Sequence, residues 1–167
     1  GYLKFASDGS LLCSTLVGTS TDTTVQLFSF DSQTGIVSNP IALAFNGQTT
    51  NAYSSEFSAD MTKLYVVAFN GNFIDQYDIT SGVRATIIAS RIDVGGGGTV
   101  KSCVQMGPDG RIYVSRNGTT FLGAITQPDA SGASCNYVDN AVNLGSGRAN
   151  LGFPNFIQSY FRKFDIG

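Results

Sequence analysis

The sequence contains no histidine and no tryptophan, and charged residues make up only 13% of its 167 residues. Without histidine, the chain has no imidazole to act as a general base, to complete a Ser-His-Asp triad or to bind a metal. Ten Lys and Arg stand against 12 Asp and Glu, and the net charge of −2 lacks the basic excess that nucleic-acid binding uses. These absences exclude histidine-based catalysis and predict no nucleic-acid partner.

Long hydrophobic runs are also missing. The longest apolar stretch covers the six residues 64–69, whereas a membrane-spanning helix needs about 20. The first residues lack the pattern of a signal peptide, so a secreted form would have lost that segment or carry it outside the printed sequence. We therefore expect no membrane insertion. The 42% hydrophobic content can fill a core, and the low charge leaves a surface of Ser, Thr, Asn, Gln and Gly.

Cysteine is scarce and odd in number. The three thiols, Cys13, Cys103 and Cys135, have no Cys-x-x-Cys spacing, so the sequence predicts no zinc site, no other metal and no cofactor. Each lies within or beside an apolar stretch, which predicts buried, unpaired side chains. The alternative is one disulfide, Cys103–Cys135. No histidine is available to activate a thiol, so we expect no catalytic cysteine.

An internal repeat is the main positive feature of the sequence. Three similar segments are centred on aspartates that follow one another at intervals of 52 and 49 residues: Asp8, Asp60 and Asp109. Turn glycines keep nearly the same period, at intervals of 47 and 50 residues: Gly35, Gly82 and Gly132. Two independent features thus share a period of about 50 residues, which is typical of repeat architectures such as propellers.

Each repeat predicts four β-strands. The first two strands flank an aspartate turn such as Ser-Asp-Gly or Pro-Asp-Gly, and the third ends in Asp-x-x-x-Gly. A fourth strand is predicted over residues 37–43, 85–92 and 137–143, where β-branched and aromatic residues are frequent. No stretch of about ten residues or more has a helical period.

Four antiparallel strands per repeat describe the blade of an all-β protein, the β-propeller. We predict blades over residues 1–47, 48–98 and 99–147, with 148–167 as the first strand of a further blade and a tail. Strand one of each blade should line the central channel and strand four should lie outermost. Because propellers close with about four to eight blades, this predicts one incomplete propeller domain, completed by remaining blades or another protein chain. The alternative is a smaller, compact sheet protein.

The repeats resemble known propeller repeats. Phe5-Ala-Ser-Asp-Gly, Asp75-Gln-Tyr-Asp-Ile-Thr-Ser-Gly and Pro108-Asp-Gly-Arg-Ile-Tyr-Val are similar to WD40-like or YVTN-like repeats. The ending, Asn155-Phe-Ile-Gln-Ser-Tyr-Phe, resembles the last part of a propeller in large secreted Bacteroidetes proteins, including gliding-motility and adhesion proteins that use type IX secretion. The chain departs from these repeats where Met61 replaces a turn glycine.

The resemblance implies a secreted or cell-surface address, and it carries no catalytic motif. The first hypothesis is a noncatalytic propeller module that serves protein binding, adhesion or docking of a surface ligand such as a glycan. The second is a part of a propeller enzyme, a lyase or hydrolase, with its catalytic residues in missing blades. The third is a structural spacer in a surface filament. The sequence leaves the ligand, the blade total and the oligomeric state open.

Candidate binding residues lie at matching positions of the three predicted inner strands: Lys4, Glu56 and Gln105. Polar side chains there can converge on a propeller axis. Four glycines at 95–98 lack the Gly-Lys-Ser/Thr ending of a phosphate loop and predict a flexible connection between blades. Thr23, within Asp-Thr-Thr, fits a short O-glycosylation pattern of Bacteroidetes.

Overall fold

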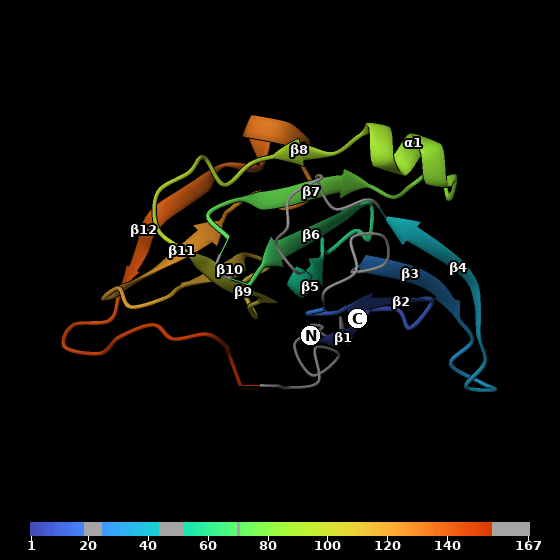
Figure 1. Cartoon of the computed structure of the whole chain (residues 1–167), viewed down its shortest axis with the longest axis horizontal. Helices are drawn as coiled ribbons and strands as arrows, with labels where there is room; N and C mark the ends of the chain where they lie inside the picture. Colours follow the sequence, from blue (N-terminus) through green and yellow to red (C-terminus); the bar gives the residue numbers. More distant parts are fainter. Residues whose placement is uncertain (19–24, 44–51, 70, 155–167) are drawn as a thin grey trace, which may run out of the picture.

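The protein folds into three four-stranded antiparallel sheets, each built from consecutive strands (Figure 1). The computed structural model describes residues 1–18, 25–43, 52–69 and 71–154. Thr23 and residues 155–167 of the predicted further strand and tail (148–167) lie outside these ranges. The first sheet contains β1 (Leu3–Phe5), β2 (Leu11–Thr15), β3 (Val25–Phe30) and β4 (Val37–Leu43).

The second and third sheets repeat this order. The second contains β5 (Ala52–Phe57), β6 (Lys63–Ala68), β7 (Ile74–Asp78) and β8 (Ile92–Asp93). The third contains β9 (Lys101–Met106), β10 (Ile112–Arg116), β11 (Phe121–Ile125) and β12 (Tyr137–Asn143). The predicted all-β class, with three four-stranded blades, is confirmed.

The repeated aspartates form turns, as their sequence context predicted. Asp8 Oδ1 accepts a hydrogen bond from the Ser10 amide at 2.9 Å, and Asp60 Oδ1 accepts one from the Thr62 amide at 3.0 Å. Met61, at the glycine position of its turn, has a φ of +61°. This is the left-handed region that a side chain disfavours. The aspartates therefore close hairpins, and Asp60 also lies beside Asp129, whose Oδ1 accepts a hydrogen bond from the Asp60 amide at 3.1 Å.

One predicted fourth strand is wrong in the second repeat. Residues 85–92 form mainly a short helix, α1 (Arg84–Ala89), before the two-residue β8. The helical turn directs Ile87 into the core, where it is fully buried, and the Arg84 Nε donates to the Ala42 carbonyl of β4 at 2.8 Å. Packing against the first sheet therefore outweighs the β-propensity of the isoleucine pair. The other fourth strands, β4 and β12, match their predicted bounds.

Two hydrophobic clusters hold the sheets together. The first lies between the first and second sheets, and includes Cys13, Leu27, Leu64, Val66 and Ile87. The second lies between the second and third sheets, and includes Tyr65, Ile74, Val104, Ile112 and Val114. The second sheet is thus buried on both faces, which explains the continuous apolar run in β6. Among the described residues, no helix is long and apolar enough to span a membrane.

Candidate functional site

The first strands of the three sheets come together at one place in the molecule. Each of β1, β5 and β9 is the edge strand of its sheet, and β5 contacts both of the others. Figure 1 shows them converging while β4, β8 and β12 lie at the periphery. This is the arrangement predicted for the inner strands of a propeller.

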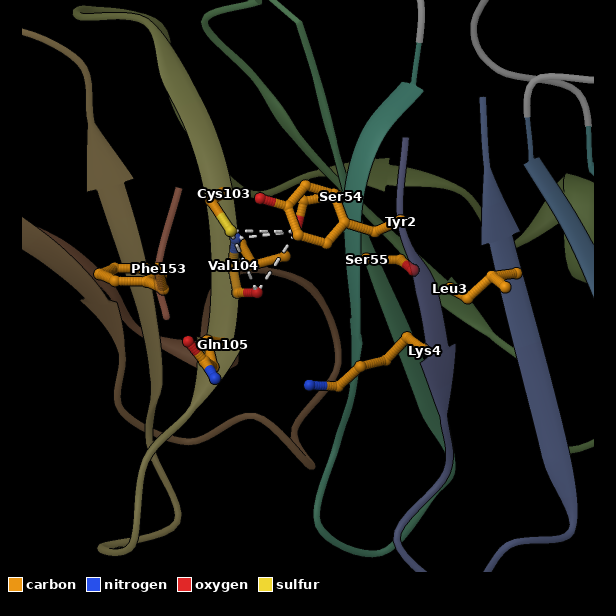
Figure 2. Close-up of a pocket in the computed structure, with 9 residues that line it drawn as sticks. All are labelled: Tyr2, Leu3, Lys4, Ser54, Ser55, Cys103, Val104, Gln105 and Phe153. Carbon is orange, nitrogen blue, oxygen red and sulfur yellow. Dashed lines mark hydrogen bonds between the residues drawn. The ribbon is translucent and has the colours of Figure 1, made fainter. Parts of the chain in front are cut away.

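A small hollow lies between these inner strands (Figure 2). Its free volume is about 30 Å³, enough for about two water molecules. It is lined by residues of all three inner strands and one later residue: Tyr2, Leu3, Lys4, Ser54, Ser55, Cys103, Val104, Gln105 and Phe153. We call this feature the axial hollow.

Most residues that line the hollow stand at matching positions of the three repeats. The predicted residues Lys4 and Gln105 line the hollow, whereas Glu56 does not. Tyr2, Ser54 and Cys103 line it as well and were missed by the sequence prediction. Each stands two residues before one of the predicted positions. Since side chains alternate along a strand, residues two apart lie on the same face, and this spacing could have identified them.

Glu56, the only glutamate of the chain, joins all three sheets. Its side chain is fully buried. Its Oε2 lies 2.6 Å from the Lys4 Nζ of β1 and accepts a hydrogen bond from the Met106 amide of β9 at 2.8 Å, while Oε1 accepts one from the Phe57 amide at 3.0 Å. The carboxylate is therefore held by one ammonium and two backbone amides. It is a clamp between sheets and not the solvated channel wall that was the alternative expectation.

The remaining polar groups of the hollow are hydroxyl, thiol and amide groups, which can donate or accept hydrogen bonds. The Gln105 Nε2 donates to the Pro154 carbonyl at 3.1 Å, and the Ser54 Oγ lies 3.4 Å from the Cys103 Sγ. Burial, together with the neighbouring Cys103 and Tyr53, raises the pKa of Tyr2 to about 12. The Tyr2 phenol is therefore neutral near pH 7.

Aromatic rings adjoin the hollow on the side of Tyr2. The Tyr2 and Tyr53 rings meet edge to face with centroids 5.3 Å apart, and Tyr53 is 5.4 Å from Phe69. Phe153 lines the opposite side in Figure 2. Apolar rings beside a few polar groups are the usual composition of a small-molecule site.

The predicted alternative of a Cys103–Cys135 disulfide is wrong. All three cysteines are free and buried. Cys103 lies on β9, at one edge of the third sheet, whereas Cys135 lies in the 3₁₀ turn that leads into β12, at the other edge. Adjacent strands are about 4.8 Å apart, so a sheet width of three such steps exceeds the reach of a disulfide.

Native thiol labelling should therefore be negligible. Burial raises the pKa of Cys13 to about 12 and also raises the pKa of Cys135, and only the thiolate reacts quickly. We expect Ellman's reagent to detect no thiol in the native protein and three after unfolding without a reductant. A single thiol in the unfolded, unreduced protein would show that a disulfide forms.

The glycine segment 95–98 contacts a buried lysine through the Gly97 carbonyl. Lys101 is fully buried, and its Nζ donates to the carbonyls of Asn72 at 2.9 Å and Thr99 at 3.4 Å, and also to that of Gly97. The ammonium lies 5.5 Å from the centre of the Tyr137 ring. A phosphate loop presents N–H groups to an anion, whereas this loop presents carbonyls to a cation of the chain itself.

A second buried carboxylate, Asp75, lies on β7. The Arg91 Nη1 donates to its Oδ1 at 2.8 Å. Burial raises the pKa of Asp75 to about 6, although Arg91 opposes this shift. Because the folded pKa exceeds the unfolded value, the contribution of Asp75 to stability is fully present below about pH 4 and is lost as the pH rises through 6.

The Asp75→Asn variant should isolate this effect. Asparagine mimics the protonated acid, so the free energy of unfolding of the variant, relative to that of the wild type, should rise by about 2 to 3 kcal/mol between pH 4 and pH 7. Urea unfolding of both proteins at the two pH values measures it. A difference that is independent of pH would contradict the raised pKa.

Metal ligands do not gather in the part of the chain that the structure describes. No three Cys, Asp or Glu side chains there lie close enough together to hold an ion. Taken together, the geometry describes a polar hollow for hydrogen bonding with aromatic walls.

Comparison with known proteins supports the fold. No protein-family model and no curated protein matches the chain. Among solved structures, it is similar to a putative 6-phosphogluconolactonase from Bacteroides fragilis (15% identity, TM-score 0.59, covering 90% of this chain and 40% of that one). It is also similar to the periplasmic gluconolactonase of Pseudomonas aeruginosa (20%, TM-score 0.55, 88% and 40%) and to hydrazine synthase from Kuenenia stuttgartiensis (19%, TM-score 0.56, 90% and 37%).

These similarities establish the β-propeller fold of the chain. The chain spans about two fifths of the length of the structures that it matches. At identities of 15–20% the likeness extends to the fold alone.

Proposed function

We propose that the chain is a noncatalytic β-propeller module that binds a neutral polar ligand at the axial hollow. The observation that supports this most is the state of Glu56, whose carboxylate is close to the hollow but is occupied by Lys4 and by two backbone amides. A general base must be free to accept a proton from a substrate. The lining offers amide, hydroxyl and ammonium donors beside aromatic rings instead. A hollow with room for about two water molecules can receive one hydroxyl group of a hydroxyl-rich ligand such as a glycan.

The proposed setting is the bacterial cell surface or the extracellular space. The low charge, the polar Ser- and Thr-rich composition and the resemblance of the ending to secreted Bacteroidetes propellers support it. Adhesion, or docking of a surface protein, would be the corresponding role. Further blades, from the same polypeptide or another chain, would complete the ring.

A propeller enzyme is the second candidate function. Two of the similar structures are described as a putative 6-phosphogluconolactonase and a gluconolactonase. Under this alternative, the catalytic residues would belong to blades outside the described residues, since the hollow itself contains no free acid–base pair among them. Hydrolysis of a gluconolactone by an assembly of the chain with the blades that complete it, and not by the chain alone, would support the enzyme and contradict the noncatalytic module.

A glycan array followed by calorimetry tests the proposal. The array identifies a neutral glycan, and titration of that glycan compares the wild type with Gln105→Ala and with Gln33→Ala, a matched substitution in an exposed turn. Loss of the Gln105 amide should weaken binding at least tenfold, whereas the control should bind as the wild type does. Equal affinities of the two variants, or no binding to any neutral glycan, would contradict the proposal.

A further inference from the structure

A short segment that follows the third sheet lies against the axial hollow. It comprises residues 151–154, which come after β12 in the chain, and we call it the covering segment. Its Phe153 side chain lines the hollow (Figure 2). Its Pro154 carbonyl accepts a hydrogen bond from the Gln105 Nε2 at 3.1 Å. The side-chain amide that the sequence predicted for ligand binding is therefore occupied by the chain itself.

The covering segment also touches the lining that belongs to the first sheet. A Cβ atom added at Gly152 would lie 2.8 Å from the hydroxyl oxygen of Tyr2. Only glycine permits so close an approach of the backbone. Tyr2 stands just before β1, whereas Gln105 stands on β9. The covering segment therefore contacts the lining of the hollow at both the first and the third sheets.

The chain is held unevenly on the two sides of residue 150. Before it, Ala149 exchanges two backbone hydrogen bonds of 2.8 and 2.9 Å with the turn after β10. The Asn150 carbonyl accepts hydrogen bonds from the hydroxyl groups of Ser102 and Ser115. Among the described residues, one hydrogen bond then ties the covering segment to the sheets, and three of its four residues are exposed. It can therefore move while residues 149 and 150 stay in place.

We infer that the covering segment is a displaceable, autoinhibitory cover, which occupies the axial hollow in place of a ligand. This inference rests on the proposed function of the hollow. The Gln105 amide can donate to a ligand only after its hydrogen bond to the Pro154 carbonyl breaks. A ligand that displaces the cover must supply an acceptor oxygen in exchange, from a hydroxyl or a carbonyl group. The cover lowers the apparent affinity in proportion to the fraction of molecules in which the hollow is open.

The Cys103 thiol reports on the cover without any ligand. Cys103 lines the hollow and is buried, and a hollow with room for about two water molecules excludes a thiol reagent. Phe153→Ala should therefore accelerate the modification of Cys103 by methyl methanethiosulfonate about tenfold, as measured by peptide mass spectrometry. Leu151→Ala, in the same segment but outside the lining, should react as the wild type does. Cys13 and Cys135 lie in the hydrophobic clusters and should stay unmodified.

Glycan binding provides the second measurement. The neutral glycan with the strongest array signal should bind Phe153→Ala about fivefold more tightly than the wild type, because the open fraction rises. Leu151→Ala should bind it as the wild type does. Weaker binding to Phe153→Ala would show that the ring is part of the ligand site, and would overturn the inference.

Gly152→Ala gives an independent opening of the cover, since its methyl group would overlap the Tyr2 hydroxyl. It should also accelerate the modification of Cys103. Unchanged modification in both Phe153→Ala and Gly152→Ala would overturn the inference, because the segment would be a fixed wall. Acceleration at Cys13 or Cys135 as well would indicate general loosening, with the same consequence. Acceleration at Cys103 alone, with no glycan bound by any variant, would support the cover and contradict the proposed function.

Discussion

Replacing Glu56 by alanine is expected to lower the free energy of unfolding by about 3 to 5 kcal/mol. The carboxylate joins Lys4 of the first sheet, its own second sheet and the Met106 amide of the third. Its loss leaves the buried amides of Phe57 and Met106 without their acceptor, and each unsatisfied amide costs about 1 to 3 kcal/mol. Thermal unfolding followed by circular dichroism should show a midpoint lower by about 10 °C for a domain of this size.

Two further variants define the cause. Glu56→Gln keeps the shape and an acceptor oxygen, so it should lose about half as much stability. Asp31→Ala removes a carboxylate that also accepts hydrogen bonds from the amides of Gln33 and Thr34, but at an exposed turn, and should cost much less stability because water can replace these hydrogen bonds. Equal losses for Glu56→Ala and Asp31→Ala would contradict the clamp.

The second large effect is expected for Lys101→Met, which should lower the free energy of unfolding by about 2 to 4 kcal/mol. The methionine fills the same space, but the carbonyls of Asn72, Gly97 and Thr99 lose the ammonium that holds them. The glycine segment 95–98 would then lose its anchor. Hydrogen exchange at the buried Gly95 amide, which donates to the Asp93 Oδ1 at 2.8 Å, should accelerate at least tenfold, and urea unfolding measures the stability.

Lys63→Met is the matched control for Lys101→Met. The Lys63 ammonium pairs with the Asp78 carboxylate at 3.1 Å, at a partly exposed site, and such pairs contribute about 1 kcal/mol or less. Lys63→Met should leave the exchange of the Gly95 amide unchanged. Acceleration in both variants, or in neither, would contradict the role of Lys101 in ordering the loop.

The fold was largely predictable because the repeated turns show where each strand begins and ends. The aspartate and glycine turns recur with one period, and each pair of turns defines the ends of strands that the hydrophobic pattern alone leaves ambiguous. The helix α1 was not predictable from local propensity, because its formation depends on the packing of Ile87 in the core between the first and second sheets. The conformation of residues 84–89 is therefore determined by packing between the first and second sheets and not by the local sequence alone.

The site was predictable in position but not in chemistry. The repeat located Lys4, Glu56 and Gln105 on the inner strands, yet the burial of Glu56 depends on an amide of β9, 50 residues away in sequence. The lysine at 101 was missed for the same reason, since its partners are backbone carbonyls, which have no signature in the sequence. A ligand-binding role of Lys4 and Gln105 stays a prediction.

An NMR titration tests most directly whether the axial hollow is the binding site. A neutral glycan selected on the array is added to the ¹⁵N-labelled chain, and the side-chain amide signals of Gln105 are followed with the backbone amides of β5 and β9. The account predicts that these signals shift, while the amides of the exposed turn at residues 31–35 do not. Shifts confined to outer strands or turns, with the Gln105 signals unmoved at saturation, would contradict the account.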